Sequence, residues 1–181
     1  VNDLLLTSLS YSLCQWRGED KCIVNLEGHG REDVGEKIDI SNTIGWFTVQ
    51  FPLYLNFDTG VDLGAQIKSV KEQYRRVPEK GIGYGIWRYW QQDIKALAEP
   101  WISFNYLGDF DVKPNKAADG WNYSFKGSGN PIAESNMQKN PLIDINGWKI
   151  SNCLEFEFTY HTGFFEAGEI QKLADTFGAH L

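Results

Sequence analysis

The sequence lacks the features that mark several common classes of protein. It has no run of basic residues, and its 17 Lys and Arg are outnumbered by 24 Asp and Glu, for a net charge of −7. An acidic chain without a basic patch has little attraction for a phosphate backbone. No apolar run approaches the ~18 residues that a membrane span needs, and no secretory signal pattern is seen. Partners of the nucleic-acid or membrane class are therefore not expected.

Cysteine and histidine are too few and too scattered to predict a metal centre. The three cysteines are Cys14, Cys22 and Cys153, and the three histidines are His29, His161 and His180. None of them stand at the spacings typical of metal ligands. An odd number of cysteines without obvious pairs is typical of a reducing compartment. We expect a cytoplasmic protein with no bound metal.

Two widespread catalytic motifs are also missing. No Gly-x-Ser-x-Gly elbow is present, which argues against a serine nucleophile of the hydrolase type. The segment Gly81-Ile-Gly-Tyr-Gly85 is rich in glycine, but no strand pattern precedes it and no Lys-Ser/Thr follows it, as a nucleotide loop requires. We interpret this segment, which contains Tyr84, as a tight loop that shapes a tunnel.

Aromatic and apolar residues are abundant. Hydrophobic residues make up 42% of the 181 residues, with 11 Phe, 8 Tyr and 7 Trp, which is enough to build a core for one domain or one large lobe. The chain starts at Val1, without an initiator methionine, and enters a helical pattern at once. It ends at Leu181 inside another helical pattern, so we expect both ends to continue into a longer protein.

The periodicity of apolar residues predicts about four helices and a mixed sheet. A helix capped by Asn2 or Asp3 ends at Gly18, a second follows Asp62, a third covers 86–98, and the last covers 170–181. Strands are predicted at 22–27, in one or two pieces within 43–55 interrupted at Pro52, and at 102–108, 121–125 and 154–160. Residues 143–150 are predicted to form a hairpin with an Asn-Gly turn. The expected fold class is α/β, in the two-layer α+β form with helices packed on a mixed sheet.

The segment Leu26-Glu-Gly-His-Gly-Arg-Glu32 is the most promising site. Strand alternation places Glu27 at the end of a strand, on the same face as Ile23 and Asn25. The two glycines allow a sharp turn, so this carboxylate can approach a substrate as a general acid or base. The alternative is a surface glutamate paired with Arg31.

Neighbouring polar residues are candidates for support. His29 and Arg31 offer a base and an anion clamp, but we favour a role in which Arg31 holds the loop or a nearby carboxylate and His29 supports a neighbour. Asn105 and Tyr106, on a largely apolar strand, are candidates for polar groups at a cleft. The alternative for Tyr106 is a core position with its hydroxyl satisfied.

Several motifs in a fixed order resemble those of one family. They are Val1-Asn-Asp-Leu-Leu-Leu6, Glu27-Gly-His-Gly-Arg-Glu32, Asn42-Thr-Ile-Gly-Trp-Phe-Thr48, Pro78-x-x-Gly-x-Gly-Tyr-Gly85 and Phe104-Asn-Tyr-Leu-Gly108. Together they resemble the epimerization domains of nonribosomal peptide synthetases, and the resemblance covers the whole chain. The Glu-Gly-His-Gly-Arg-Glu segment is what separates such domains from the related condensation domains.

The resemblance implies a chloramphenicol-acetyltransferase-like fold of two lobes with a tunnel between them. Residues 1–181 resemble the C-terminal lobe only, since the His-His-x-x-x-Asp-Gly motif of the N-terminal lobe is absent. This lobe alone is expected to be inactive. The implied partners are that missing lobe, a peptidyl carrier protein and the adjacent synthetase modules.

The implied reaction inverts the α-carbon of an aminoacyl or peptidyl thioester held on the phosphopantetheine arm of the carrier protein, without pyridoxal phosphate or metal. By position, Glu27 matches the acid/base glutamate and Arg31 the arginine of its motif. Asn105 and Tyr106 match a polar pair in a tunnel-side strand, and Tyr84 lies in the Gly-Tyr-Gly motif. Asn42 departs from the usual arginine, which implies weaker anchoring. Alternatives are a condensation domain, a non-catalytic carrier-docking lobe and an unrelated acyltransferase.

Overall fold

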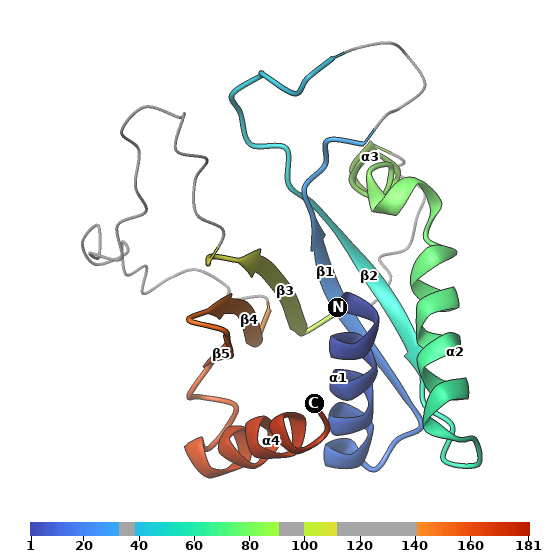
Figure 1. The fold of residues 1–181 in the computed structure, drawn as a ribbon, viewed down its shortest axis with the longest axis vertical. Helices are drawn as coiled ribbons and strands as arrows, with labels where there is room; N and C mark the ends of the chain where they lie inside the picture. The colour runs from blue at the N-terminus through green and yellow to red at the C-terminus, as the bar shows by residue number, and fades with distance from the viewer. Residues whose placement is uncertain (33–38, 91–99, 112–140) are drawn as a thin grey trace.

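The computed structural model describes residues 1–32, 39–90, 100–111 and 141–181. The described residues form two layers, with helices on one face of a five-stranded sheet (Figure 1). The elements are α1 (Asn2–Arg17), β1 (Lys21–Gly28), β2 (Val49–Asn56), α2 (Leu63–Arg75), the 3-10 turn η1 (Pro78–Gly81), α3 (Tyr84–Trp90), β3 (Ile102–Asp109), β4 (Ile143–Ile150), β5 (Cys153–Tyr160) and α4 (Ala167–Ala179).

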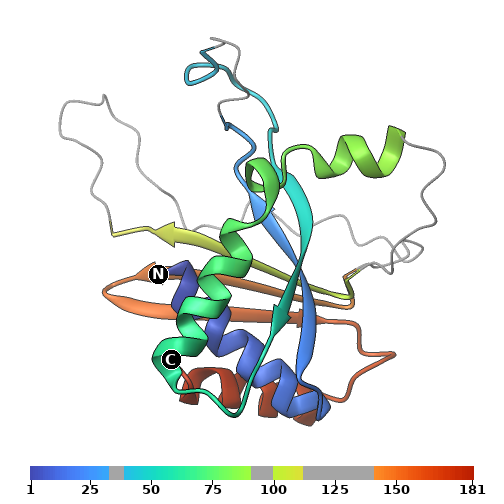
Figure 2. The ribbon, with the colours of Figure 1, turned by 90° about the vertical axis from the view of Figure 1, so that its right-hand side faces the viewer.

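The sheet has the strand order β2-β1-β3-β4-β5. The three central strands run parallel, and each edge strand is antiparallel to its neighbour. Helices α1, α2 and α4 gather on one side of this sheet, while α3 lies beyond the end of α2 (Figure 2). The predicted two-layer lobe with a mixed sheet is confirmed.

The core lies between these helices and the sheet, and strand alternation explains which residues enter it. Each strand sends every second side chain toward the helices, where apolar burial stabilises the fold. The fully buried members of this core include Leu9, Leu13, Val24, Leu55, Ile143, Ile145, Leu173 and Phe177. The other residues of each strand point to the opposite face of the sheet, and most of them are polar.

Helix boundaries were predicted well at some ends and wrongly at others. Gly18 ends α1 in the left-handed conformation, with φ of 68°, and the Asp62 carboxylate caps α2 by accepting the N–H of Ala65 at 3.1 Å. The start of α1 is different from the prediction, because Val1 is the N-cap and no side chain caps the helix. Ser8, Ser10 and Ser12 of this helix are buried, and Ser8 Oγ donates to the carbonyl of Phe177 in α4 at 3.0 Å.

The predicted interruption of the second strand at Pro52 is wrong. Strand β2 runs through Pro52, which is opposite Asn25 in the register with β1. Because β2 is an edge strand, its outward-facing backbone positions need no partner there, and proline is tolerated. The residues before Val49 are not in strand conformation.

The predicted Asn146-Gly147 turn is also wrong. Both residues lie in the middle of β4, and the chain reverses at Ser151 and Asn152, which have φ of 51° and 60°. Gly147 is needed for another reason. A Cβ added to it would lie 2.3 Å from Cε1 of Phe156 on the paired strand.

We expect the substitution Gly147→Ala to destabilise the fold. The Phe156 ring cannot retreat easily, because it packs edge-on against buried Phe177 with centroids 4.8 Å apart. Overpacking of this kind costs about 1–3 kcal/mol, measurable as a lower urea midpoint. Gly178→Ala is the control: nothing lies within 4 Å of its added Cβ, so it should leave stability unchanged or slightly raised. Equal midpoints for both variants would contradict this interpretation.

A second prediction concerns the β4–β5 turn, which is held by Asp111. Its carboxylate accepts the backbone N–H groups of Asn152 and Ser151 at 2.7 Å each, and these bonds lower the pKa of Asp111. A lowered pKa means that the stabilisation is present above the ordinary value of 3.8 and is lost as the pH falls below it. Stability should therefore fall less between pH 6 and pH 3 in Asp111→Asn than in wild type, as measured by urea unfolding at each pH. An equal fall in both would contradict the prediction.

Two predictions lie outside the described residues: the part of the third helix at 91–98 and the strand at 121–125. None of the described helices is long and apolar enough to cross a membrane.

Candidate functional site

A line of polar side chains crosses the face of the sheet that the helices leave open. Each strand contributes one residue at the same level: Gln50 of β2, Glu27 of β1, Asn105 of β3, Asn146 of β4 and Glu157 of β5. The register pairs Gln50 with Glu27, Asn105 with Asn146, and Asn146 with Glu157, and a hydrogen bond joins Asn105 to Glu27. We call this set the polar row.

Glu27 is held from both sides within the polar row. Its Oε1 accepts the Gln50 Nε2 amide at 2.7 Å, and its Oε2 accepts the Asn105 Nδ2 amide at 3.0 Å. Among the described residues, no cation lies within 4.0 Å of this carboxylate. The side chain is half-buried. The local alignment of β1, β2 and β3 thus fixes a carboxylate between two neutral amides.

Arg31 does not pair with Glu27, which removes the alternative of a simple surface ion pair. Its Nη1 donates to the carbonyl of Ile40 at 2.7 Å and its Nη2 to the carbonyl of Thr43 at 2.8 Å. The guanidinium also lies over the Phe47 ring, 4.1 Å from the centroid. Arg31 holds the segment that leads into β2.

His29 points to solvent and supports the same turn. Its Nδ1 accepts the backbone N–H of Arg31 at 3.0 Å, so its Nε2 is left to donate to Glu32 Oε1, also at 3.0 Å. The other oxygen of Glu32 lies 2.8 Å from Lys80 Nζ, and this hydrogen bond raises the pKa of Lys80. Glu32 therefore links the turn after β1 to η1.

Two glycines make close approaches that no other residue allows. Gly30 has φ of 64°, and a Cβ there would lie 1.6 Å from the carbonyl oxygen of Phe47. Gly81 has φ of 85°, and its Cβ would lie 2.1 Å from the Phe51 ring. Positive φ is costly for residues with a side chain. The turn after β1 therefore packs closely against the segment before β2, at Phe47. The glycine-rich segment packs closely against β2 itself, at Phe51.

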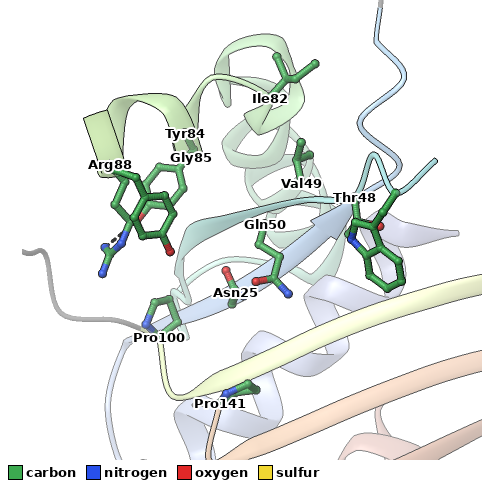
Figure 3. A pocket seen from close by; sticks show the side chains of 12 residues that line it. Asn25, Thr48, Val49, Gln50, Ile82, Tyr84, Gly85, Arg88, Pro100 and Pro141 are labelled. Carbon is green, nitrogen blue, oxygen red and sulfur yellow. Dashed lines mark hydrogen bonds between the residues drawn. The ribbon is translucent and has the colours of Figure 1, made fainter. Parts of the chain in front are cut away.

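A cavity of about 530 Å³ opens beside the polar row. Asn25 and Gln50 point into it from β1 and β2, with Tyr84 and Arg88 of α3 on another side (Figure 3). Arg88 Nη1 donates to the Tyr84 hydroxyl at 3.1 Å. The remaining lining residues are Trp46, Thr48, Val49, Ile82, Gly85, Tyr89, Pro100 and Pro141. Such a volume, with a wall of mixed polar and apolar side chains, suits a small organic ligand.

The six residues singled out in the sequence do not all meet. Glu27 and Asn105 are in contact, and Tyr84 lines the adjoining cavity. His29 and Arg31 act within the loop after β1. Tyr106 follows Asn105 on β3 and therefore points to the opposite face of the sheet, where it packs against the core.

Gln50, which donates the second hydrogen bond to Glu27, was not predicted from the sequence. Gln50 was included in the apolar stretch 43–55, although Phe51, Leu53 and Leu55 recur at every second position after it. That spacing was the available signal, since it places Gln50 on the opposite face of the strand. The pairing of Gln50 with Glu27 depends on the register of β2 against β1, which the two segments do not specify by themselves. No group of ligands suited to a metal ion is formed by the residues described.

Comparison with known proteins identifies the family to which this chain belongs. The family model described as "Condensation domain" matches residues 1–181. The chain belongs to the condensation-domain family. Its mixed sheet with helices on one face is the predicted chloramphenicol-acetyltransferase-like lobe.

The chain is similar to particular synthetases and domains. It is 39% identical to surfactin synthase subunit 1 of Bacillus subtilis (strain 168), over all of this chain and 5% of that protein. It is 37% identical to gramicidin S synthase 1 of Brevibacillus brevis, over all of this chain and 17% of that protein. The chain thus spans a small part of these relatives.

Solved structures give a similar result. The epimerization domain from the third module of tyrocidine synthetase B has a TM-score of 0.85 and 37% identity, over 99% of this chain and 40% of that one. The starter condensation domain of rhizomide synthetase has a TM-score of 0.64 at 12% identity, over 98% and 40%. The second likeness shows the fold alone.

Proposed function

We propose that this chain is the C-terminal lobe of an epimerization domain in a nonribosomal peptide synthetase. The domain would invert the α-carbon of an aminoacyl or peptidyl residue, from L to D. The substrate is a thioester on the phosphopantetheine arm of a peptidyl carrier protein. Glu27 is the acid/base group of this lobe, and a second group comes from the N-terminal lobe.

The observation that carries the proposal is the Glu27 carboxylate itself. It is held between Gln50 and Asn105 on the open face of the sheet, at 2.7 and 3.0 Å, beside a cavity. It has no cation partner among the described residues. A carboxylate with only neutral partners keeps lone pairs available for a proton, because an ionised carboxylate has about four acceptor sites. The likeness to an epimerization domain at 37% identity supports the same function.

Inversion of the α-carbon requires two acid/base groups, one on each side of this carbon. The thioester carbonyl makes the α-hydrogen acidic, so one base removes it as a proton and leaves an enolate. Return of a proton from the opposite face gives the other configuration, and return from the same face restores the first. Hydrogen-bond donors near the thioester oxygen would stabilise the enolate. Asn105 bonds Glu27 and is therefore placed to position it.

A condensation domain is the second candidate, since the matching family model carries that description. It would join two carrier-bound residues by an amide bond and would give Glu27 no part in proton transfer. A lobe that only docks carrier proteins would give neither product.

The experiment uses the full-length protein that carries residues 1–181. Its carrier protein is loaded with an L-aminoacyl thioester in D2O, and a second carrier protein bearing an aminoacyl thioester is supplied as an acceptor. The products are analysed for an amide bond, for configuration and for deuterium at the α-carbon. We expect the D-isomer and deuterium at this carbon in both isomers. Amide product without deuterium would replace the proposal with condensation, and neither product would replace it with docking.

A further inference from the structure

We propose that Gln50 is a positioning residue for Glu27, fixing the orientation of its carboxylate at the edge of the cavity. The proposal rests on the proposed function, because it concerns the same proton transfer. Gln50 stands directly opposite Glu27 in the register of β2 and β1. Its Nε2 donates to Glu27 Oε1 at 2.7 Å, the shorter of the two bonds that this carboxylate accepts.

One hydrogen bond would not be enough to orient the carboxylate. The last torsion of a glutamate side chain, between a tetrahedral and a planar carbon, has a broad and nearly two-fold energy profile. With only the Asn105 bond to Oε2, the group could swing about that contact. The second bond, from Gln50 on the opposite neighbouring strand, fixes both oxygens. Proton transfer depends steeply on such geometry, and a misplacement of about 1 Å can cost ~100-fold in rate.

A neutral amide suits this task better than a cation would. Lysine or arginine at position 50 would bind the carboxylate as an ion pair and hold it in its charged form. Glutamine holds the same oxygen with a single N–H and brings no charge. Two bonds occupy about half of the acceptor sites of a carboxylate, so the others remain free for the substrate proton.

Gln50 is itself held in place by the residues of the turn after β1. Arg31 binds the carbonyls of Ile40 and Thr43, and Gly30 lets the chain pass against Phe47, three residues before Gln50. These contacts set where β2 begins and thereby which residue faces Glu27. The geometry of this turn therefore affects Glu27 in two ways, directly through β1 and across the sheet through Gln50.

Gln50 also contacts both Glu27 and the cavity. It lines the 530 Å³ space, whereas Glu27 is not among the lining residues. Its side chain points into this space beside Asn25 (Figure 3). Within the described part of the chain, no donor binds its carbonyl oxygen. A ligand that fills the cavity would therefore contact the Gln50 amide, which orients the Glu27 carboxylate.

The test compares three variants of the full-length protein in the carrier-thioester assay. Gln50→Met removes the amide and keeps the length of the side chain, and Gln50→Glu keeps its shape but has no N–H. Gln171→Met is the matched control, because Gln171 donates an equivalent bond to Asp175 at 2.8 Å on the exposed side of α4. We expect a fall of about 10- to 100-fold in kcat for both Gln50 variants, with little change in KM, and no change for the control.

Exchange in D2O separates positioning from a general structural defect. The L- and D-aminoacyl thioesters are offered separately, and α-deuterium is measured in the enantiomer that was supplied. If Gln50 positions Glu27, exchange of one enantiomer falls while the other, deprotonated by the opposite base, is largely kept. Glu27→Gln should show the same preference.

The outcomes distinguish this inference from the proposed function. Equal losses for both enantiomers would make Gln50 a structural residue and overturn the inference. Wild-type rates for both Gln50 variants, with Glu27→Gln impaired, would also overturn it and leave the proposed function standing. Wild-type rates for Glu27→Gln would overturn the proposed function itself.

Discussion

The substitution Glu27→Gln is expected to lower epimerization of a carrier-bound aminoacyl thioester by about 100- to 10,000-fold, the usual contribution of a general acid or base. An amide of the same shape cannot take or return the proton. The fold should survive, because Gln50 and Asn105 can turn their own amides to present either N–H or C=O to the new side chain. The measurement is the rate at which the D-isomer forms from an L-aminoacyl thioester on the carrier protein, with circular dichroism as the check on folding.

Glu157→Gln is the matched control for this change. Glu157 belongs to the polar row and is exposed on β5, opposite Asn146 in the register. The same chemical change on the same face of the sheet should leave the rate within about twofold of wild type, since surface substitutions usually have small effects. A comparable loss in both variants would mean that the charge of the open face matters and that Glu27 has no special part in the reaction.

The substitution Gly30→Ala is expected to have the second largest effect. Its Cβ would lie 1.6 Å from the Phe47 carbonyl oxygen and 2.7 Å from the carbonyl carbon, and both atoms are backbone. Backbone cannot yield as the end of a side chain can, and the positive φ of 64° adds strain. The segment before β2 must therefore move, and Gln50 moves with it. We expect about 100-fold lower activity and about 1–3 kcal/mol lower stability.

Gly83→Ala tests whether this effect is specific. Gly83 is exposed and nothing lies within 4 Å of a Cβ added to it. Activity and urea midpoint should both stay near the wild-type values. If Gly30→Ala is as harmless as Gly83→Ala, the close contact between the turn after β1 and Phe47 does not exist in solution.

The elements that could be predicted are those in which local sequence and tertiary packing agree. Gly18 and Asp62 are helix-ending and helix-starting residues that can be recognised in the local sequence. They correctly predicted the end of α1 and the start of α2. Asn146-Gly147 is also a strong local signal, yet it failed. The space beneath Phe156 requires a residue without a side chain, and this tertiary demand explains the glycine better than a turn does.

The candidate site was predictable only in part for the same reason. The alternation of residues in β1 correctly predicted that Glu27 lies on the polar face of the sheet. The two glycines Gly28 and Gly30 predicted the turn that follows this strand. The bond from Asn105 depends on β3 lying next to β1, although 73 residues of chain (29–101) separate the two strands. The bond from Gln50 depends on a strand register. Tyr106 was a candidate for the same cleft as Asn105 because the two residues are adjacent in the sequence. It lies instead on the other face of the sheet, against the core.

The central claim is that the Glu27 carboxylate exchanges a proton with the α-carbon of a carrier-bound residue. The most direct measurement is a crystal structure of the full-length protein with a stable amide analogue of the thioester on its carrier arm. We predict that a Glu27 oxygen lies about 3–3.5 Å from the α-carbon, with the Gln50 and Asn105 bonds intact. An α-carbon more than ~6 Å from that carboxylate, beyond reach through one bridging water, would contradict the account.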